Sequence, residues 1–410
     1  MTILKYEMKK MIRGKTSVAA IGLLVLLTVG LCIGYIHSAY YIREDGEKIN
    51  GIPAIAKLRE VKKEWSGYVT EEVVAKVITL NNELYQNPEY MTQDGWLDDR
   101  GYSRQQGYSD LRDLINDTYR DSFSDFDYFS INRLTPADAD DFYHRRELIY
   151  DEWLSREEVQ AQFSGEKREY IREHALNLKQ PYEYEYAGGW EKVKEMNVSL
   201  LLASVVVICV VLASDFAVEC QTGADAIYLS TRLGKRTGNK MKIAAGFMLA
   251  TILYWGFLLI GDAAVLLAYG TSGEDAMIQL ELWKSLYSLT QEQAWILTLL
   301  MGYLGCMAMS GLTMLLSSKL KTAFGTIILS FLILMVPAIA GQSVTQPFWQ
   351  IFFSLCPHGT IMSYDFLSSY TLYQIGSRIY TPFTVLPLLY IPLTALTVPF
   401  TYYGFQRYKA

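Results

Sequence analysis

The segment 38–196 contains no cysteine, although the chain has five, and this absence excludes a disulfide framework for the segment. Its 159 residues must therefore be stabilised by a core of their own, which that length allows. Histidine is also scarce in the chain. The four histidines show no metal-ligand spacing, so we expect no metal site; they are His37, His144, His174 and His358.

The sequence also lacks a complete phosphate-binding loop, which has the form Gly-x-x-x-x-Gly-Lys-Ser/Thr between a strand and a helix. Gly14-Lys15-Thr16 supplies only the second half, because Lys9 stands where the first glycine is needed. Gly234-Lys235 is followed by Arg236 instead of a hydroxyl residue. Paired catalytic residues are missing too. We therefore expect that the chain is not an enzyme, binds no cofactor directly and has no nucleic-acid partner.

What the chain does have is six long apolar runs. A helix of about 20 apolar residues crosses a hydrocarbon core of roughly 30 Å, and these runs lack the alternating pattern of a membrane barrel strand. We therefore predict an all-α polytopic membrane protein with six transmembrane helices. The runs cover residues 17–36, 198–213, 243–269, 294–316, 323–340 and 383–405.

Basic residues lie almost entirely on one side of these spans. Fourteen Lys and Arg occur in four segments that would face one compartment, and the two shorter segments facing the other way hold one each, Lys284 and Arg378. Basic residues near spans stay on the cytoplasmic side, which predicts a multi-pass bacterial plasma-membrane protein with both termini cytoplasmic. The four segments are 1–16, 214–242, 317–322 and 406–410.

The segment 38–196 differs in charge from the rest of the chain. It carries 33 Asp and Glu against 21 Lys and Arg, a net of −12, whereas the remaining residues have a net of +6. Apolar residues at helical spacing over 54–65 and 70–85 predict helices, and alternating Tyr182, Tyr184 and Tyr186 predict a short strand. We expect a helix-rich extracytoplasmic domain. Its acidic surface either attracts cationic ligands or serves ordinary solubility.

These observations divide the chain into consecutive parts. The outer segment 341–382 is too apolar for a solvated loop and too broken to span, so it is predicted to be re-entrant or interfacial. Pro387, Pro392 and Pro399 predict a kinked or locally unwound last span. The predicted parts are a cytoplasmic amphipathic elbow over 1–16, transmembrane helix 1 over 17–37, the extracellular domain over 38–196, transmembrane helix 2 over 197–214, a cytoplasmic coupling loop over 215–242, and transmembrane helices 3 to 6 over 243–410.

The loop 215–242 carries the most specific motif. An acidic residue follows the second span, and a glycine then allows the chain to turn. A short apolar helix comes next, and basic residues precede the third span. Such a helix cannot bury its apolar face within the loop. It therefore needs a partner, which is either the membrane surface or another protein.

The order of residues in this loop resembles that of the ABC-2 type permeases, the membrane subunits of ATP-driven exporters. The matching residues are Glu219, Gly223, Leu229-Ser230-Thr231, Lys235 and Lys240, whereas Arg232 replaces the usual proline. The resemblance also covers the six-span layout, the basic elbow and the outer re-entrant segment. It covers the domain 38–196 only by position.

The resemblance implies a permease that exports a peptide, an antibiotic, a lipid or an ion. Two copies of a separate ABC ATPase subunit would bind ATP and Mg, and a second permease copy or a related permease would complete the dimer in the lipid bilayer. The loop helix would be the coupling helix that docks on the ATPase. The implied coupling residues are Glu219, Gly223, Ala224, Asp225, Ile227, Tyr228, Leu229, Ser230, Arg232, Lys235 and Arg236.

Two alternatives stay open. The chain is also consistent with a membrane sensor or receptor, whose outer domain binds a peptide and signals through the cytoplasmic loop, although a receptor needs fewer spans. Asp262, within the third span, is a candidate to line a substrate path, because a carboxylate there costs roughly 2.5–3.5 kcal/mol on insertion scales. The competing interpretation places Asp262 near the outer interface, seven residues before the run ends at Tyr269.

Overall fold

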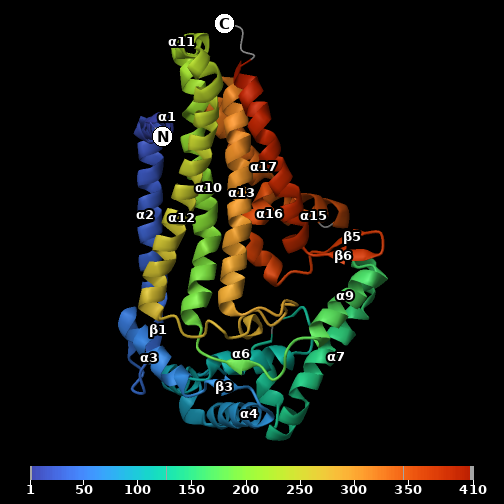
Figure 1. The fold of residues 1–410 in the computed structure, drawn as a ribbon. Coiled ribbons are helices and arrows are strands. Elements are labelled where there is room, and N and C mark those ends of the chain that lie inside the picture. The colour runs from blue at the N-terminus through green and yellow to red at the C-terminus, as the bar shows by residue number, and fades with distance from the viewer. Residues whose placement is uncertain (1, 126, 345, 407–410) are drawn as a thin grey trace.

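The computed structural model describes residues 2–125, 127–344 and 346–406. It is nearly all helical, and its long helices form a bundle that stands on a smaller helical domain (Figure 1). Six helices are long and apolar enough to cross a membrane, as predicted. They are α2 (Lys15–Ser38), α10 (Gly188–Thr222), α12 (Asn239–Tyr269), α13 (Gln291–Leu320), α14 (Ala323–Ser343) and α17 (Pro382–Gln406).

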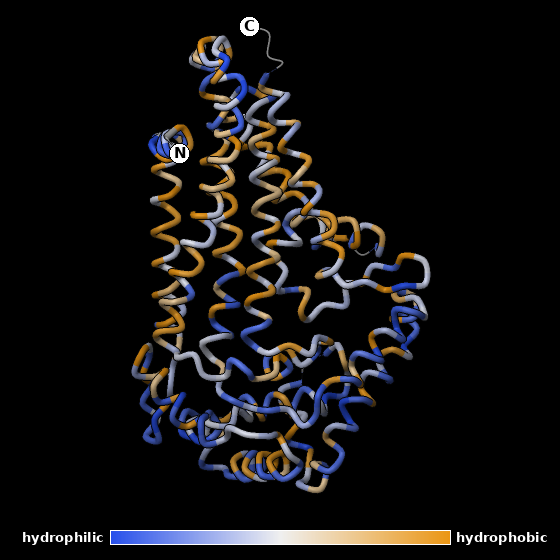
Figure 2. Tube along the Cα trace, in the orientation of Figure 1, coloured by the Kyte–Doolittle hydropathy of each residue, from blue (hydrophilic) through white to orange (hydrophobic). Residues whose placement is uncertain are grey.

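Helices α10 and α13 form the centre of this bundle. Both are largely buried, whereas α2, α14 and α17 leave most of their apolar side chains exposed, and Figure 2 shows the apolar residues running along these helices. Close approach at the centre depends on glycine. A Cβ at Gly302 would lie 2.6 Å from the Tyr254 hydroxyl of α12, and a Cβ at Gly311 would lie 2.2 Å from the Thr397 hydroxyl of α17. Small residues allow such helix contacts in membranes.

Helix α17 corrects one expectation. It runs unbroken from Pro382 to Gln406 although Pro387, Pro392 and Pro399 lie inside it, so the predicted local unwinding is wrong. Membrane helices tolerate proline because neighbouring groups satisfy the freed backbone carbonyls.

The domain between α2 and α10 contains seven α-helices, short 3-10 turns and two short antiparallel pairs of strands within the described residues. Strands β3 and β4 pair Tyr68 with Glu183, which confirms the strand predicted from the alternating tyrosines. The elements are β1 (Tyr40–Ile42), β2 (Lys48–Asn50), α3 (Ile52–Lys63), β3 (Gly67–Tyr68), α4 (Glu71–Gln86), η1 (Pro88–Tyr90), α5 (Asp99–Gln105), α6 (Ser109–Thr118), η2 (Ser130–Arg133), η3 (Pro136–Asp141), α7 (Phe142–Leu154), α8 (Glu157–Gln162), α9 (Gly165–Leu176) and β4 (Glu183–Tyr184).

The inserted domain is continuous with the rest of the molecule. Helix α10 begins at Gly188, so residues 188–196, which the sequence assigned to the domain, form the first turns of the second long helix. The core of the domain also includes side chains from outside residues 38–196. Trp283, Leu286 and Leu372, from two later segments of the chain, complete it. The Arg146 guanidinium donates to the Trp283 carbonyl at 2.8 Å, which fastens the domain to the connection between α12 and α13.

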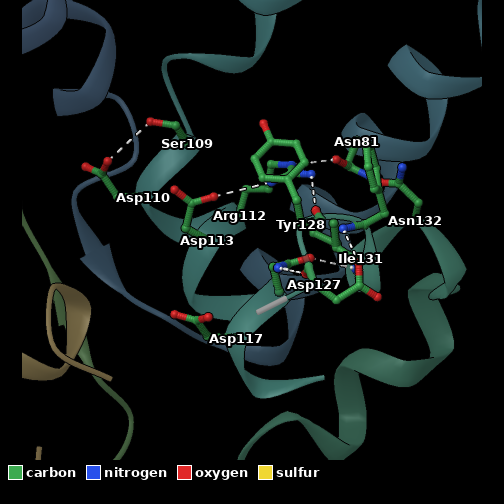
Figure 3. Close-up of polar contacts among 12 residues, drawn as sticks. Asn81, Ser109, Asp110, Arg112, Asp113, Asp117, Asp127, Tyr128, Ile131 and Asn132 are labelled. Atoms are coloured by element: carbon green, nitrogen blue, oxygen red, sulfur yellow. Dashed lines mark hydrogen bonds and ion pairs between the residues drawn. The ribbon is translucent and has the colours of Figure 1, made fainter. Parts of the chain in front are cut away.

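A buried polar network stiffens the inserted domain around Arg112 of α6 (Figure 3). The Arg112 side chain donates to the Asn81 Oδ1 atom of α4 at 3.0 Å and to the Tyr128 carbonyl at 2.9 Å. Asn81 in turn donates to the Asn132 side chain at 2.8 Å. Arg112 therefore connects α4, α6 and the segment that follows α6.

The segment after α14 folds back beside the bundle. Figure 1 shows α15 (Pro347–Ser354) and α16 (Pro357–Ile361) partway along the bundle, where α15 contacts α14 and α16 contacts α13 and α14. Phe348 and Phe352 of α15 are exposed apolar side chains. The chain then forms η6 (Ser363–Leu367) and a hairpin of β5 (Tyr373–Ile375) and β6 (Arg378–Tyr380), which contacts α9.

Candidate coupling site at helix 11

The loop between α10 and α12 is held by a sharp turn. Gly223 ends α10 with a positive φ of 72°, a backbone conformation that glycine adopts without steric cost. The chain then forms α11 (Ala224–Ser230), an extended residue at Thr231, and a π-helical turn, η4 (Gly234–Gly238), that leads into α12. Figure 1 shows α11 at the end of the bundle farthest from the inserted domain, beyond the level of α1 (Thr2–Arg13).

Tyr228 attaches α11 to the bundle. Its ring lies against Phe405 of α17, with ring centroids 6.3 Å apart. The π-helical turn leaves room for this side chain, because a Cβ at Gly238 would lie 2.3 Å from the Tyr228 hydroxyl. Burial raises the pKa of Tyr228, so its hydroxyl keeps its proton. Leu229 is also partly buried.

The opposite face of the loop is exposed. Ile227 is 75% exposed and Leu233 is 70% exposed, which is unusual for two apolar side chains so close together. Basic and small residues surround them, and the exposed members of the predicted coupling set are Gly223, Ala224, Ile227, Ser230, Arg232, Lys235 and Arg236.

Two members of that set lie elsewhere. Glu219 and Asp225 are 5% and 3% exposed, so neither carboxylate is on the outer surface of the loop as expected for a direct docking contact. Glu219 points into the bundle because cationic partners from two other helices meet it there. Its role in coupling would therefore act through contacts within the chain.

Glu219 belongs to a buried ionic cluster of five residues. The Lys242 Nζ atom of α12 lies 2.6 Å from Glu219 Oε1 and 3.6 Å from Asp215 Oδ1, and the Lys242 side chain is fully buried. Lys10 of α1 also pairs with Glu219 and lies 3.8 Å from Glu7. Three carboxylates thus share two ammonium groups. The cluster joins α1, α10 and α12 immediately below α11.

Aromatic rings enclose Lys242. Its Nζ atom lies 4.9 Å from the centre of the Phe216 ring, 5.8 Å from that of Phe405 and 5.9 Å from that of Tyr228. Tyr228 comes from α11 and Phe405 from α17. A displacement of α11 would therefore move a ring that contacts Lys242 in the charged cluster. For Lys10, partial burial opposes the charge, but the hydrogen bond and charge of Glu219 outweigh burial, so its pKa is raised.

Asp262 lies in a separate place, toward the inserted-domain end of the bundle. Its Oδ2 atom accepts hydrogen bonds from Trp295 Nε1 at 2.9 Å and Asn197 Nδ2 at 3.2 Å. The side chain is buried between helices, and Oδ1 has no hydrogen-bond partner among the described residues. Neutral donors from two neighbouring helices therefore hold this carboxylate inside the bundle. Asp262 therefore lies apart from the predicted coupling residues.

Sequence reasoning missed the ionic cluster as a unit. Asp215 and Glu219 lie four residues apart, which places them on one face of a helix, and this spacing was the available signal. It does not tell which cations would face them. Lys242 had been interpreted only as a basic residue that leads into the third span. Its burial depends on the rings from α11 and α17.

Comparison with protein-family models, curated proteins and solved structures found no match for this chain. Among the described residues, no group of three or more His, Cys, Asp or Glu side chains is placed to hold a metal ion.

Proposed function

We propose that this chain is the permease subunit of an ABC-2 type ABC exporter and that α11 is its coupling helix. The observation that carries the proposal is the contrast between the two faces of the loop 223–236. One face exposes Ile227 and Leu233, and the other is fastened through Tyr228 to a buried ionic cluster. A projection of this kind can receive a displacement from a partner and pass it into the long helices.

A protein is a better partner for α11 than the membrane surface. Helix α1 carries Lys5, Lys9 and Arg13 beside the apolar side chains Ile3 and Ile12, a composition that suits a helix lying on a membrane surface. Because α11 extends beyond α1 along the bundle (Figure 1), lipid at the level of α1 would not cover Ile227 and Leu233.

The proposal assigns sides and partners. In this proposal α1 and α11 lie in the cytoplasm and the inserted domain lies outside the cell, in a bacterial plasma membrane, which the distribution of basic residues supports. Two ATPase subunits would bind ATP and Mg, and their closure would displace α11 of each permease copy. The exposed apolar faces of α2, α14 and α17 are available to lipid and to a second permease copy. The exported substrate would be a peptide, an antibiotic, a lipid or an ion.

Substitution of the two exposed apolar residues tests the proposal. We expect Ile227→Asp with Leu233→Asp to weaken binding of the proposed ABC ATPase partner by about 100-fold or more, because apolar anchors contribute about 2 kcal/mol each at an interface. The measurement is co-purification of tagged permease with that ATPase, followed by titration of the purified subunits.

The matched control is Ile375→Asp, which changes a residue of similar exposure, 67%, in the β5–β6 hairpin that contacts α9 and lies away from α11 (Figure 1). It should leave ATPase binding unchanged. Equal binding by all three proteins would contradict the coupling role of α11.

ATP-driven transport in liposomes would then separate an exporter from a sensor, since a sensor would bind its ligand without moving it.

A further inference from the structure

A cavity of about 560 Å³ opens in the inserted domain where β1, α3, α4 and α5 meet, well away from α11 (Figure 1). This volume lies within the range of cavities that hold small organic molecules. Its walls are aromatic, and the rings come from Tyr41, Trp65, Tyr90 and Tyr108.

Three carboxylates line the cavity, and none of them forms an ion pair with another described residue. They are Glu44, Glu64 and Glu83, and all three are exposed. Arg104 is the cation among the lining residues, and its guanidinium lies over the Tyr90 ring, 5.3 Å from the ring centre. The lining therefore has a net charge of −2.

Helix ends add to the negative potential. Glu64 is the C-cap of α3 and Asn87 is the C-cap of α4, and both residues line the cavity. The C-terminal end of a helix carries a partial negative charge equivalent to about half an electron. Two such ends at one cavity favour a cation there.

The wall of the cavity also contains a buried tyrosine. Tyr108 is 3% exposed, and its hydroxyl has almost no accessible surface and no hydrogen-bond partner among the described residues, so Tyr108 contributes its ring and not its hydroxyl to the lining. The Tyr108 ring packs against Trp65 with centroids 5.4 Å apart. The face of Trp65 already carries a cation, because the Lys76 Nζ atom lies 4.6 Å from the ring centre.

We propose that this cavity binds an organic cation, namely an amine or guanidine carried on an apolar body. The rings of Tyr41, Trp65 and Tyr90 hold the apolar body. The carboxylates of Glu44, Glu64 and Glu83 balance the charge. A free organic amine and a side chain of a basic peptide share this chemistry.

Binding is measured with the full-length protein in nanodiscs of zwitterionic lipid, without an ATPase. The probe is Nα-acetyl-arginine β-naphthylamide, and its neutral isostere, Nα-acetyl-citrulline β-naphthylamide, is the reference. We expect the arginine compound to bind at least about tenfold tighter. The triple variant E44Q/E64Q/E83Q should lose about tenfold in affinity, since exposed ion pairs contribute about 0.2–1 kcal/mol each.

The control variant E157Q/E158Q/E173Q removes the same number of exposed carboxylates from α8 and α9. It should change affinity less than twofold. Equal losses in the two triple variants, or equal binding of the arginine and citrulline compounds, would overturn the proposal.

A short peptide of alternating arginine and tryptophan then identifies the source of the cation. Tighter binding than the single arginine compound assigns a basic peptide, and equal binding assigns a small amine. Neither result depends on ATPase coupling. Failure of the cation-binding test would therefore leave the proposed coupling function untouched, and the reverse also holds.

Discussion

Replacing Lys242 with methionine is expected to destabilise the bundle strongly. Methionine keeps most of the side-chain volume but removes the ammonium group that faces Glu219 and Asp215, and Asp215 would then be buried without a cation. Removing one partner from a buried ion pair costs about 3–5 kcal/mol. The measurement is the temperature at which the purified protein in detergent aggregates, and we expect it to fall by roughly 5 °C or more.

The neighbouring carboxylate provides a control of opposite sign. Three carboxylates share two ammonium groups in this cluster, so Asp215→Asn removes the excess negative charge and should leave the aggregation temperature unchanged or higher. The double variant with Asp215→Asn and Lys242→Met should recover part of the loss. If Lys242→Met and Asp215→Asn lower the temperature equally, the cluster is not held by charge balance.

The cluster also links stability to the proposed function. Lys242 touches rings from α11 and α17, and Glu219 holds Lys10 of α1. A permease with a weakened cluster could still bind its ATPase through Ile227 and Leu233, since these residues lie on the exposed face. We therefore expect Lys242→Met to reduce transport more than ATPase binding. Loss of both in equal measure would mean that the cluster only supports the loop.

The six spans were predictable from the sequence because the bilayer imposes a length and a continuous apolar composition on any spanning helix. Their ends were less predictable. Helix α10 runs from Gly188 to Thr222, well beyond the apolar run 198–213. At one end Lys194 pairs with Glu281 of the α12–α13 connection, and the other end packs against α1. Hydropathy alone does not register such contacts.

Capping patterns in the sequence correspond to helix starts in only some cases. Thr135 with Asp138 forms a capping box at the start of η3, with Pro136 at the first position. Thr70 caps α4, accepting from the Val73 amide at 3.4 Å. The Ser155 hydroxyl, in contrast, lies in a Ser-x-x-Glu pattern but donates to the Glu152 carbonyl, and α8 begins after Arg156 without a side-chain cap. A preceding helix offered Ser155 another partner.

The candidate site was predictable in position but not in the orientation of its side chains. The glycine at 223 and the basic residues marked a loop that turns back to the membrane. Whether Glu219 faces outward or inward depends on Lys10 and Lys242, which are remote in sequence. The same limit applies to Asp262, whose neutral partners Asn197 and Trp295 come from two other helices.

Replacing Arg112 with methionine is expected to loosen the inserted domain without disturbing the bundle. The side chain is 1% exposed, and its loss would leave the Asn81 Oδ1 atom and the Tyr128 carbonyl without their donors. Each buried polar group left unsatisfied costs about 1–3 kcal/mol, so the total is about 3 kcal/mol. Amide hydrogen exchange in α4 and α6 should then become about 100-fold faster.

The control for this experiment is Asp113→Asn, which removes the ionic partner of Arg112 but not its buried acceptors. The Asp113 side chain is 64% exposed, so its pair with Arg112 at 3.3 Å is screened by water and should contribute less than about 1 kcal/mol. Exchange in α4 and α6 should change less than about fivefold, and exchange in α10 and α13 should not change in either variant. If Asp113→Asn accelerates exchange as much as Arg112→Met, the ion pair and not the buried hydrogen bonds holds these helices together.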